Sequence, residues 1–428
     1  MAKRAFDVIL YGASGFTGKL CVEYMAKQSS TKGIRWAIAG RNGTKLEEVK
    51  ADVAKKLNLS PESVAAIPVI TASSDDLDSL KEMAKQATVV LSTAGPFAKI
   101  GTPVVDACVD SGTNYVDITG ESVFVRNIID TYHDVAVEKK LKIIPCCGFD
   151  CTPVDMGCDL LVETMKNKNL EPKEVRQVLI KMKGGASGGT IDSVLNMFDS
   201  YSLEELKKTG NPFYLNPRLS DGTIDQSREK QTRIHSADRK SAMYDSVLKK
   251  WCVPFIMQAI DTRVINRSNA IGKPDGWKYG KEFIYTEGVG ASSAMAARIT
   301  AAMMPIVGTL LYFKFTRPLI RYFLPKSGEG PTEKQRETGM FYFKSWGRGV
   351  DKDGNEHIVN GKVLAPNGDG GYKQTSIMVC ESAMSLAMDH QLEDCPQLYG
   401  VLTPSTGLGK PYRRRLEVNP GISFEASM

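Results

Sequence analysis

The segment FDVILYGASGFTG, residues 6–18, decides how the rest of the chain folds. Residues 6–11 form an apolar run of strand length, and residues 19–27 repeat apolar side chains at helical spacing. Between them, Gly12 allows a turn off the strand, Gly15 allows backbone N–H groups to approach an anion, and Gly18 removes a side chain where helix meets sheet. Because the helix N-terminus faces this turn, the pattern predicts a dinucleotide-binding site. The alternative is a plain tight turn.

The residues after the second predicted strand indicate which cofactor binds. Residues 34–39 are strand-like and end in Gly40-Arg41-Asn42, where an enzyme that prefers NAD carries an acidic residue for the ribose 2′-hydroxyl. An arginine offers a planar fork for a 2′-phosphate and a face that stacks on adenine. Lys45 adds a second positive charge one turn further on. The sequence therefore favours NADP(H) over NAD(H), with a solvated loop charge as the alternative role of Arg41.

Strand-like and helix-like segments alternate through the first 150 residues. Further strands are expected at residues 65–70, 88–94, 114–118 and 142–145, with helices at 44–57, 75–85, 101–111 and 123–139. This alternation predicts an α/β fold with a Rossmann-type parallel sheet. Small residues that end the strand at 88–94 suit close passage of the nicotinamide, although a simple turn is the alternative. The cofactor-binding residues are accordingly predicted to be Gly12, Ala13, Ser14, Gly15, Phe16, Thr17, Gly18, Arg41, Asn42, Lys45, Ser92, Thr93, Ala94, Gly95 and Pro96.

Composition narrows the classes of protein. With 428 residues, the chain is long for one domain, so two are expected. The net charge is only +6, and no lysine- and arginine-dense run with interleaved aromatic residues indicates nucleic-acid binding. The nine cysteines show no paired metal-ligand spacing, and no signal peptide is recognisable. We therefore expect no metal site, reduced thiols, and an intracellular protein that is not secreted.

A series of motifs runs through nearly the whole chain. They are GASGFTG at 12–18, AGRN at 39–42, STAGPF at 92–97, NYVDITGE at 114–121, GFDCTPVDMG at 148–157, GGASGGT at 184–190, WCVPFIM at 251–257 and GYKQT at 371–375. In this order they resemble the saccharopine dehydrogenase-like oxidoreductases. The resemblance implies a Rossmann domain, an α+β domain with a mixed sheet, and a C-terminal tail that returns to the Rossmann domain. It does not imply a substrate, because such relatives include lipid-linked reductases and proteins seen on lipid droplets.

The expected domain boundaries follow these motifs. Residues 1–155 are predicted to form the Rossmann domain, residues 156–370 an α+β substrate or dimerisation domain, and residues 371–428 a helix and tail that pack back on the Rossmann domain. Strands of the second domain are expected at 175–182, 251–257, 262–266, 283–286, 341–349 and 357–365. The glycine-rich stretch 184–190 suits either an anionic group of the substrate or close packing.

The segment 288–326 departs from the pattern of a soluble domain. Arg298 is its only charge before residue 314, and a basic stretch follows that contains Lys314, Arg317, Arg321 and Lys326. A membrane-spanning helix needs about 20 apolar residues, whereas residues 299–313 give 15 and include Pro305. An apolar helical hairpin that lies in a membrane or lipid-droplet surface fits this pattern better than a span. The alternatives are burial against the sheet and a contact in a homodimer.

Hydride transfer often needs a proton donor near the nicotinamide. The candidates that end predicted strands on the cofactor side are Tyr115, Asp117, Glu121 and Asp150, each with a structural role as the alternative.

Three functions remain open from the sequence. The favoured one is an NADP(H)-dependent oxidoreductase that acts on a lipid-like or apolar carbonyl or enoyl substrate, at the cytosolic face of a membrane or lipid droplet or in the mitochondrion. The second is a catalytically silent NADP-binding protein that serves as a membrane or lipid-droplet interaction factor. The third is a saccharopine-type amino-acid reductase, which would need convergent arginines such as Arg263 and Arg267.

Overall fold

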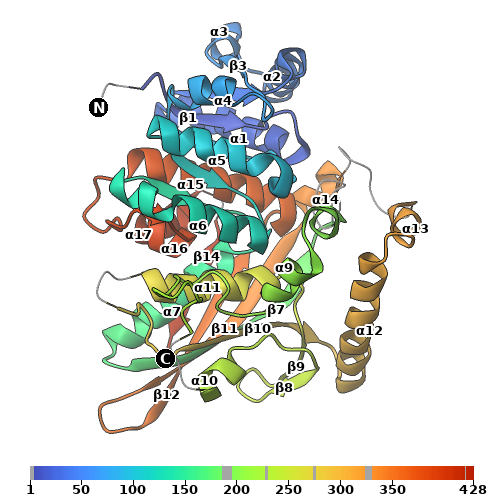
Figure 1. The fold of residues 1–428 in the computed structure, drawn as a ribbon, viewed down its shortest axis with the longest axis vertical. Coiled ribbons are helices and arrows are strands. Elements are labelled where there is room, and N and C mark those ends of the chain that lie inside the picture. The colour runs from blue at the N-terminus through green and yellow to red at the C-terminus, as the bar shows by residue number, and fades with distance from the viewer. Residues whose placement is uncertain (1–3, 186–194, 227–229, 273–275, 323–329, 420) are drawn as a thin grey trace.

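Two seven-stranded sheets organise the chain, one above the other in Figure 1. The computed structural model describes residues 4–185, 195–226, 230–272, 276–322, 330–419 and 421–428. Every strand pair of the first sheet is parallel, and the strand order is β13-β6-β5-β4-β1-β2-β3. This order and direction confirm the predicted Rossmann-type sheet.

The first sheet is buried between helices, and the core residues Val8, Ile9 and Leu10 of β1 are fully buried because helices cover both faces. Its strands are β1 (Phe6–Tyr11), β2 (Trp36–Gly40), β3 (Val69–Thr71), β4 (Ala87–Ser92), β5 (Asn114–Asp117), β6 (Lys142–Ile144) and β13 (Gly400–Val401). The helices between them are α1 (Phe16–Lys32), α2 (Gly43–Leu57), α3 (Pro61–Ala65), α4 (Leu77–Ala84), α5 (Phe97–Ser111) and α6 (Ser122–Glu138). The strand expected at 65–70 begins only at Val69, because Ser60 caps α3 and holds residues 61–65 in a helix.

The second sheet is mixed and has the order β14-β12-β11-β7-β10-β9-β8. Strands β7 and β10 run parallel, whereas the other pairs are antiparallel. The strands are β7 (Glu171–Lys183), β8 (Met243–Asp245), β9 (Lys250–Val253), β10 (Ile284–Ala291), β11 (Met340–Val350), β12 (Glu356–Ala365) and β14 (Ser423–Ser427). The helices of this part are α7 (Thr152–Asn167), α9 (Leu203–Lys208), α10 (Lys230–His235), α11 (Gln258–Ile271), α12 (Ala294–Tyr312), α13 (Arg317–Tyr322) and α14 (Glu333–Glu337). The predicted mixed sheet is confirmed.

One predicted strand of the second sheet is wrong. Residues 262–266 lie inside helix α11, in which every residue from Ile260 to Asn269 is buried. A helix that is buried on all sides has no solvent-facing stripe, so its sequence lacks the helical periodicity that would identify it. The strand expected at 251–257 is shorter than predicted, because β9 ends at Val253 and a turn follows.

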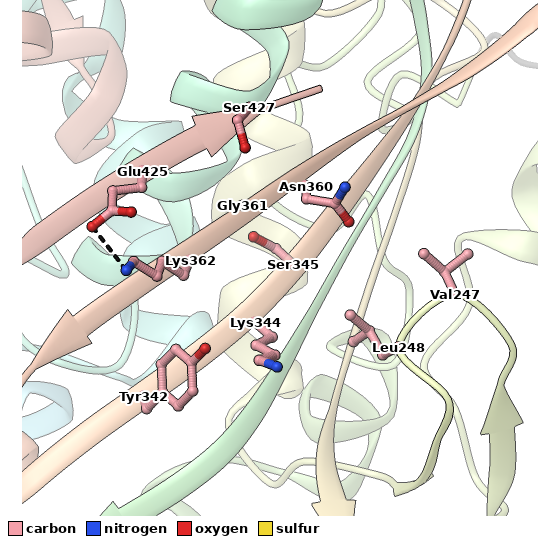
Figure 2. A pocket seen from close by; sticks show the side chains of 10 residues that line it. All are labelled: Val247, Leu248, Tyr342, Lys344, Ser345, Asn360, Gly361, Lys362, Glu425 and Ser427. Carbon is pink, nitrogen blue, oxygen red and sulfur yellow. Dashed lines mark ion pairs between the residues drawn. The ribbon is translucent and has the colours of Figure 1, made fainter.

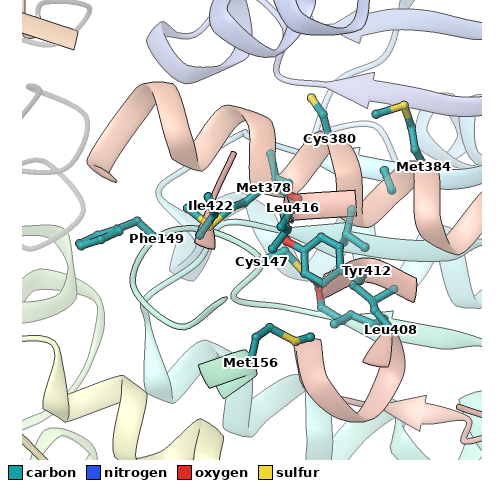
Figure 3. Packing of buried hydrophobic residues seen from close by; sticks show 14 of the residues in the cluster. Cys147, Phe149, Met156, Met378, Cys380, Met384, Leu408, Tyr412, Leu416 and Ile422 are labelled. Carbon is teal, nitrogen blue, oxygen red and sulfur yellow. Dashed lines mark hydrogen bonds between the residues drawn. The ribbon is translucent and has the colours of Figure 1, made fainter. Parts of the chain in front are cut away.

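The C-terminal segment connects the two sheets. Helix α15 (Thr375–Met388) packs on α1, β4 and β5, and β13 pairs with β6 as an edge strand. In the cluster of Figure 3, the Tyr412 hydroxyl donates a hydrogen bond to the Met378 carbonyl at 2.9 Å. The remaining elements are η1 (Gly370–Gln374), α16 (Pro404–Gly407) and α17 (Gly409–Val418). The tail therefore returns to the first sheet as predicted, but its last strand, β14, pairs with β12 of the second sheet.

Helix α12 lies at the side of the molecule (Figure 1), where it contacts β9 and β10 of the second sheet. The Ser293 side chain accepts a hydrogen bond from the Ala296 N–H, so the helix begins at residue 294 and runs for 19 residues. Residues 288–291 belong to β10. Only Ala297 and Ala301 of the helix are buried. The predicted alternative of burial against the sheet is therefore wrong. The apolar side chains that α12 and its C-cap expose are Met295, Ile299, Met303, Ile306, Val307, Leu310, Tyr312 and Phe313.

By length and composition, α12 is able to cross a membrane, with a mean hydropathy of 1.5 and 11% of its apolar window buried. It is not one arm of a symmetric hairpin, because α13 has only six residues. Residues 323–329, which include Lys326, lie outside the described part of the chain.

Candidate cofactor and active site

The glycine turn between β1 and α1 has no room for side chains at two of its three glycines. Gly12 has a φ of +85°, and a Cβ atom there would lie 2.7 Å from the Ala94 nitrogen at the end of β4. A Cβ atom at Gly18 would lie 2.2 Å from the Gly12 carbonyl oxygen. The Gly15 N–H donates to that same oxygen at 3.0 Å, which closes the turn. The chain is therefore folded tightly enough for its backbone to reach a pyrophosphate.

The end of β4 is joined to this turn. The Thr93 N–H donates to the Tyr11 carbonyl at 2.9 Å, and the Thr93 hydroxyl lies 3.2 Å from the Gly12 carbonyl. These bonds place the predicted residues 92–96 beside the glycine turn, on the carboxyl side of the sheet. The structure thus brings together the two segments that sequence reasoning assigned to one site.

Distant segments also reach the turn, and sequence reasoning missed them. The Phe16 ring packs edge-on against Tyr372 of η1, with a centroid distance of 5.2 Å. The Arg336 guanidinium lies 5.4 Å from the centre of the same ring, and a Cβ atom at Gly330 would collide with it. Arg336 therefore places a positive charge against the Phe16 ring at the start of α1. No local motif around residue 336 signals this contact.

Residues 41–45 lie at the end of β2, where the adenosine ribose binds in this fold. Arg41 is exposed, and among the described residues its guanidinium has no hydrogen-bond or ion-pair partner. Asn42 caps α2, because its side chain accepts a hydrogen bond from the Lys45 N–H at 3.0 Å. Lys45 is exposed in the first turn of α2. Arg41 and Lys45 remain available for a phosphate, whereas Asn42 already has a structural role.

Arg41→Ala is expected to weaken NADPH binding by about tenfold or more, because hydrogen bonds to a charged group contribute about 1.5–3 kcal/mol. NADH has no 2′-phosphate, so its affinity should not change. Fluorescence titration of both cofactors checks this, with Lys55→Ala as a control that removes an equal charge at the far end of α2. An equal loss for NADH would show that Arg41 does not recognise the 2′-phosphate.

Two of the four catalytic candidates form a buried structural pair. The Tyr115 hydroxyl donates to Asp117 Oδ2 at 2.9 Å, and both residues are fully buried. Asp117 Oδ1 accepts hydrogen bonds from the N–H groups of Thr119 and Cys146, at 2.9 and 3.0 Å. Burial raises the pKa of Asp117 to about 7. The pair fixes the loops that follow β5 and β6 and does not face open space.

Glu121 is committed to a helix end. Its carboxylate accepts hydrogen bonds from the Phe97 and Ala98 N–H groups, at 3.0 and 2.8 Å, and so occupies the N-terminus of α5. In contrast, the first turn of α1 has no acidic residue, and its N–H groups face the glycine turn. An anion therefore finds a helix N-terminus at α1, where the sequence predicted it, but not at α5.

Asp150 differs from the other candidates. It is half-buried after β6, and among the described residues its carboxyl has no hydrogen-bond partner. Asp150 Oδ2 would lie 3.3 Å from a Cβ atom at Gly120, which places the carboxyl beside the loop that follows β5. Burial raises its pKa to about 6. Asp150 is thus the candidate that can exchange a proton near neutral pH at the carboxyl edge of the sheet.

Two further acids lie deeper, on elements that sequence reasoning did not connect with the site. Asp261 on α11 is fully buried, and neither carboxyl oxygen has a hydrogen-bond partner within the described residues. Glu287 on β10 accepts a hydrogen bond from the Tyr285 hydroxyl at 2.8 Å, and burial raises the pKa of Glu287 to about 8. Burial likewise raises the pKa of Asp261, to which Glu287 and Asp150 also contribute. This buried cluster favours protonated carboxyl groups.

The arginines that an amino-acid reductase would need are already occupied. The Arg263 side chain bonds the carbonyls of Thr209 and Gln258 and pairs with Asp238. Arg267 donates to the carbonyls of Leu215 and Val401, and both arginines are buried in α11. They do not converge on a dicarboxylic substrate, so this part of the third hypothesis is wrong.

A hollow of about 320 Å³ on the second sheet lies outside both the cofactor site and the group of catalytic candidates (Figure 2). Strands β11, β12 and β14 and the turn after β8 line it, and a 2.9 Å ion pair between Lys362 and Glu425 crosses it. None of the predicted cofactor or catalytic residues lines this hollow.

Comparisons with known proteins agree with this geometry. Residues 8–144 match the family model of the saccharopine dehydrogenase NADP binding domain. A Mycobacterium tuberculosis relative is 31% identical over 434 residues, which cover 99% of this chain and 98% of the relative. The trans-acting enoyl reductase of Mycobacterium bovis is 32% identical, and that of Mycobacterium leprae 31%, with 97% of this chain and 96% of each relative covered.

The fold is similar to that of apo saccharopine dehydrogenase (L-Glu forming) from Saccharomyces cerevisiae. The TM-score is 0.53 at 12% identity, and 99% of each chain is covered. At an identity this low, the similarity shows only a shared fold. The full-length relatives at 31–32% identity show membership of the same family. The chain belongs to the saccharopine dehydrogenase-like oxidoreductases, and its Rossmann domain binds NADP(H).

Proposed function

We propose that this protein is an NADPH-dependent enoyl reductase that saturates the carbon–carbon double bond of an apolar 2-enoyl substrate at a membrane or lipid-droplet surface. The observation that carries the proposal is full-length similarity to proteins named trans-acting enoyl reductases, at 31–32% identity. Such a reaction needs a hydride donor and a proton donor. The NADP(H)-binding domain provides for the first, and the carboxyl of Asp150 provides the second.

The reaction adds a hydride and a proton across the double bond. NADPH, held by the glycine turn and Arg41, would supply the hydride that the β-carbon of the substrate gains. Asp150, in its protonated form, then transfers its proton to the α-carbon and is left as a carboxylate. Burial keeps this carboxyl protonated up to a pH of about 6, so the acid form is available close to neutral pH.

Turnover of a 2-enoyl thioester tests the proposal directly. Purified protein with NADPH and a long-chain 2-enoyl thioester should consume NADPH and form the saturated thioester, whereas the saturated thioester should consume none. Binding of NADPH without reduction of any enoyl or carbonyl lipid would instead support the catalytically silent NADP-binding protein.

Helix α12 supports contact with a lipid surface. Both ends of the helix are attached to the same body: Arg298 lies 5.8 Å from the centre of the Trp251 ring of β9, and Arg317, beyond the C-terminus, pairs with Asp199 at 2.6 Å. A helix held at both ends by one body cannot cross a bilayer while that body stays on one side. We therefore infer that α12 lies in the plane of the surface, with its exposed apolar side chains in the lipid.

The variant Ile299→Glu/Ile306→Glu/Leu310→Glu is expected to reduce vesicle binding by at least about tenfold, because each apolar side chain contributes about 1.5–3 kcal/mol when it is buried in lipid. Co-sedimentation with phosphatidylcholine–phosphatidylglycerol vesicles measures this effect. Leu219→Glu/Ile234→Glu/Val418→Glu is the matched control, since these side chains are also exposed but lie on other elements.

A wild-type protein that ignores vesicles would contradict lipid contact. If it also forms a dimer that the α12 variant converts to a monomer, the apolar face is a homodimer interface.

A further inference from the structure

We propose that a hollow between residues 198–206 and the C-terminal end of α12 binds the hydrocarbon chain of the substrate. The inference rests on the proposed enoyl reductase function and adds a site and a substrate class to it. The hollow measures about 300 Å³. Its walls consist of Phe198, Tyr201, Leu203 and Leu206 on one side and Tyr312, Phe313, Lys314 and Arg317 on the other.

The hollow lies close to the cofactor end of the first sheet. A hydrogen bond joins the helical residues 195–200 to α5: the Lys99 ammonium donates to Asn196 Oδ1 at 2.7 Å. Three residues later, Asp199 accepts a hydrogen bond from Arg317 at 2.6 Å. The wall of the hollow is thus linked through this helical segment to the first turn of α5, which directly follows the predicted cofactor residues Gly95 and Pro96.

The inner part of the hollow faces the same region. Tyr201 is half-buried, and burial together with the nearby carboxylate of Glu121 raises its pKa. Glu121 caps the N-terminus of α5, so its influence on the pKa of Tyr201 indicates that Tyr201 lies toward α5. A substrate whose double bond lies over the nicotinamide can therefore extend its alkyl chain past Tyr201 into the hollow.

The outer wall is held in place by Arg317. Its guanidinium donates to the carbonyls of Leu311 and Tyr312, both at 2.9 Å, and lies 5.6 Å from the centre of the Phe198 ring. These bonds satisfy carbonyl groups at the end of α12 and connect the two walls across the hollow. Arg317 is buried, so this connection is shielded from solvent.

The open end of the hollow continues into the exposed apolar face of α12. Tyr312 and Phe313 line the hollow and are also 39% and 43% exposed. Lys314 stands at the rim with 82% of its side chain exposed, and this charge is complementary to anionic lipid head groups. A long-chain acyl group drawn from a lipid surface meets apolar side chains from the surface to the active-site edge. We therefore assign the hollow to an alkyl chain rather than to a polar ligand.

Binding of a dansyl-labelled undecanoic acid to the full-length protein tests the site without any need for turnover. Wild type should bind the probe, and shorter dansyl-labelled acids should bind about fourfold more weakly for each methylene removed. Leu206→Trp fills the hollow and is expected to weaken probe binding by more than about tenfold. NADPH affinity should remain that of wild type.

Two comparisons make the test specific. Leu219→Trp, an exposed leucine outside the hollow, should bind the probe like wild type. Leu206→Asp places a charge at the same position and should weaken binding even if the tryptophan variant does not fold.

Equal probe affinity in wild type and both Leu206 variants would overturn the proposal, as would the absence of chain-length dependence. Because the probe carries no double bond, it binds whether or not the protein reduces enoyl groups. Failure of the hollow and failure of the reductase function therefore give different results.

Discussion

Gly12→Ala is expected to raise the Kd for NADPH by about 100-fold or more, which corresponds to about 2.7 kcal/mol of binding free energy. Gly12 has a φ of +85°, a region that costs an alanine roughly 1–2 kcal/mol. The new Cβ atom would also lie 2.7 Å from the Ala94 nitrogen and 2.9 Å from its Cβ atom. The turn must then move away from β4, which separates the two segments that form the cofactor site. Fluorescence titration with NADPH measures the loss.

Gly33→Ala is the matched control for this substitution. Gly33 also has a positive φ, of +64°, but a Cβ atom there would meet nothing within 4 Å. The Gly33→Ala substitution should lower the free energy of unfolding by about 1 kcal/mol and leave NADPH affinity unchanged. If Gly12→Ala binds NADPH as tightly as Gly33→Ala does, the turn does not hold the pyrophosphate.

Asp150→Asn is expected to lower kcat for the enoyl thioester by about 100-fold or more, because an amide cannot donate a proton to the α-carbon. NADPH affinity should stay unchanged, since Asp150 lies beside the loop that follows β5 and not in the glycine turn. In wild type, the acid form of Asp150 is the active one and its pKa is about 6. The kcat should therefore fall as the pH rises above about 6, and Asp150→Asn should remove this dependence.

Steady-state kinetics over a pH series checks both parts of this expectation. A variant that keeps the wild-type kcat would show that the proton comes from another donor, such as solvent. A variant with low kcat but an unchanged pH profile would show that Asp150 acts by packing and not by proton transfer.

Local patterns made the first half of the molecule predictable. The glycine turn and the alternation of strands and helices each depend on residues close in sequence, so spacing alone identified them. The apolar character of α12 was visible too, but its start was not, because residues 288–291 are as apolar as the helix and belong to β10. The cap at Ser293 separates the two elements.

Roles that depend on tertiary contacts escaped sequence reasoning. Glu121 resembles a catalytic acid until α5 is seen to place two N–H groups on its carboxylate. Arg336 reaches Phe16 across more than 300 residues of sequence, and no motif announces such a contact. Asp261 lies in the buried stretch 260–269 of α11, and this burial gave the sequence the appearance of a strand. In each case the decisive partner is distant in the chain.

The position of the last two strands has a consequence for how the chain folds during synthesis. Strand β13 completes the edge of the first sheet and β14 completes the edge of the second, and both lie in the last 29 residues of the chain. A growing polypeptide therefore exposes an unpaired edge on each sheet until residues 400–427 have been made. Unpaired edges invite association with other chains. We therefore expect the nascent chain to associate more readily through both edges before these strands pair than after.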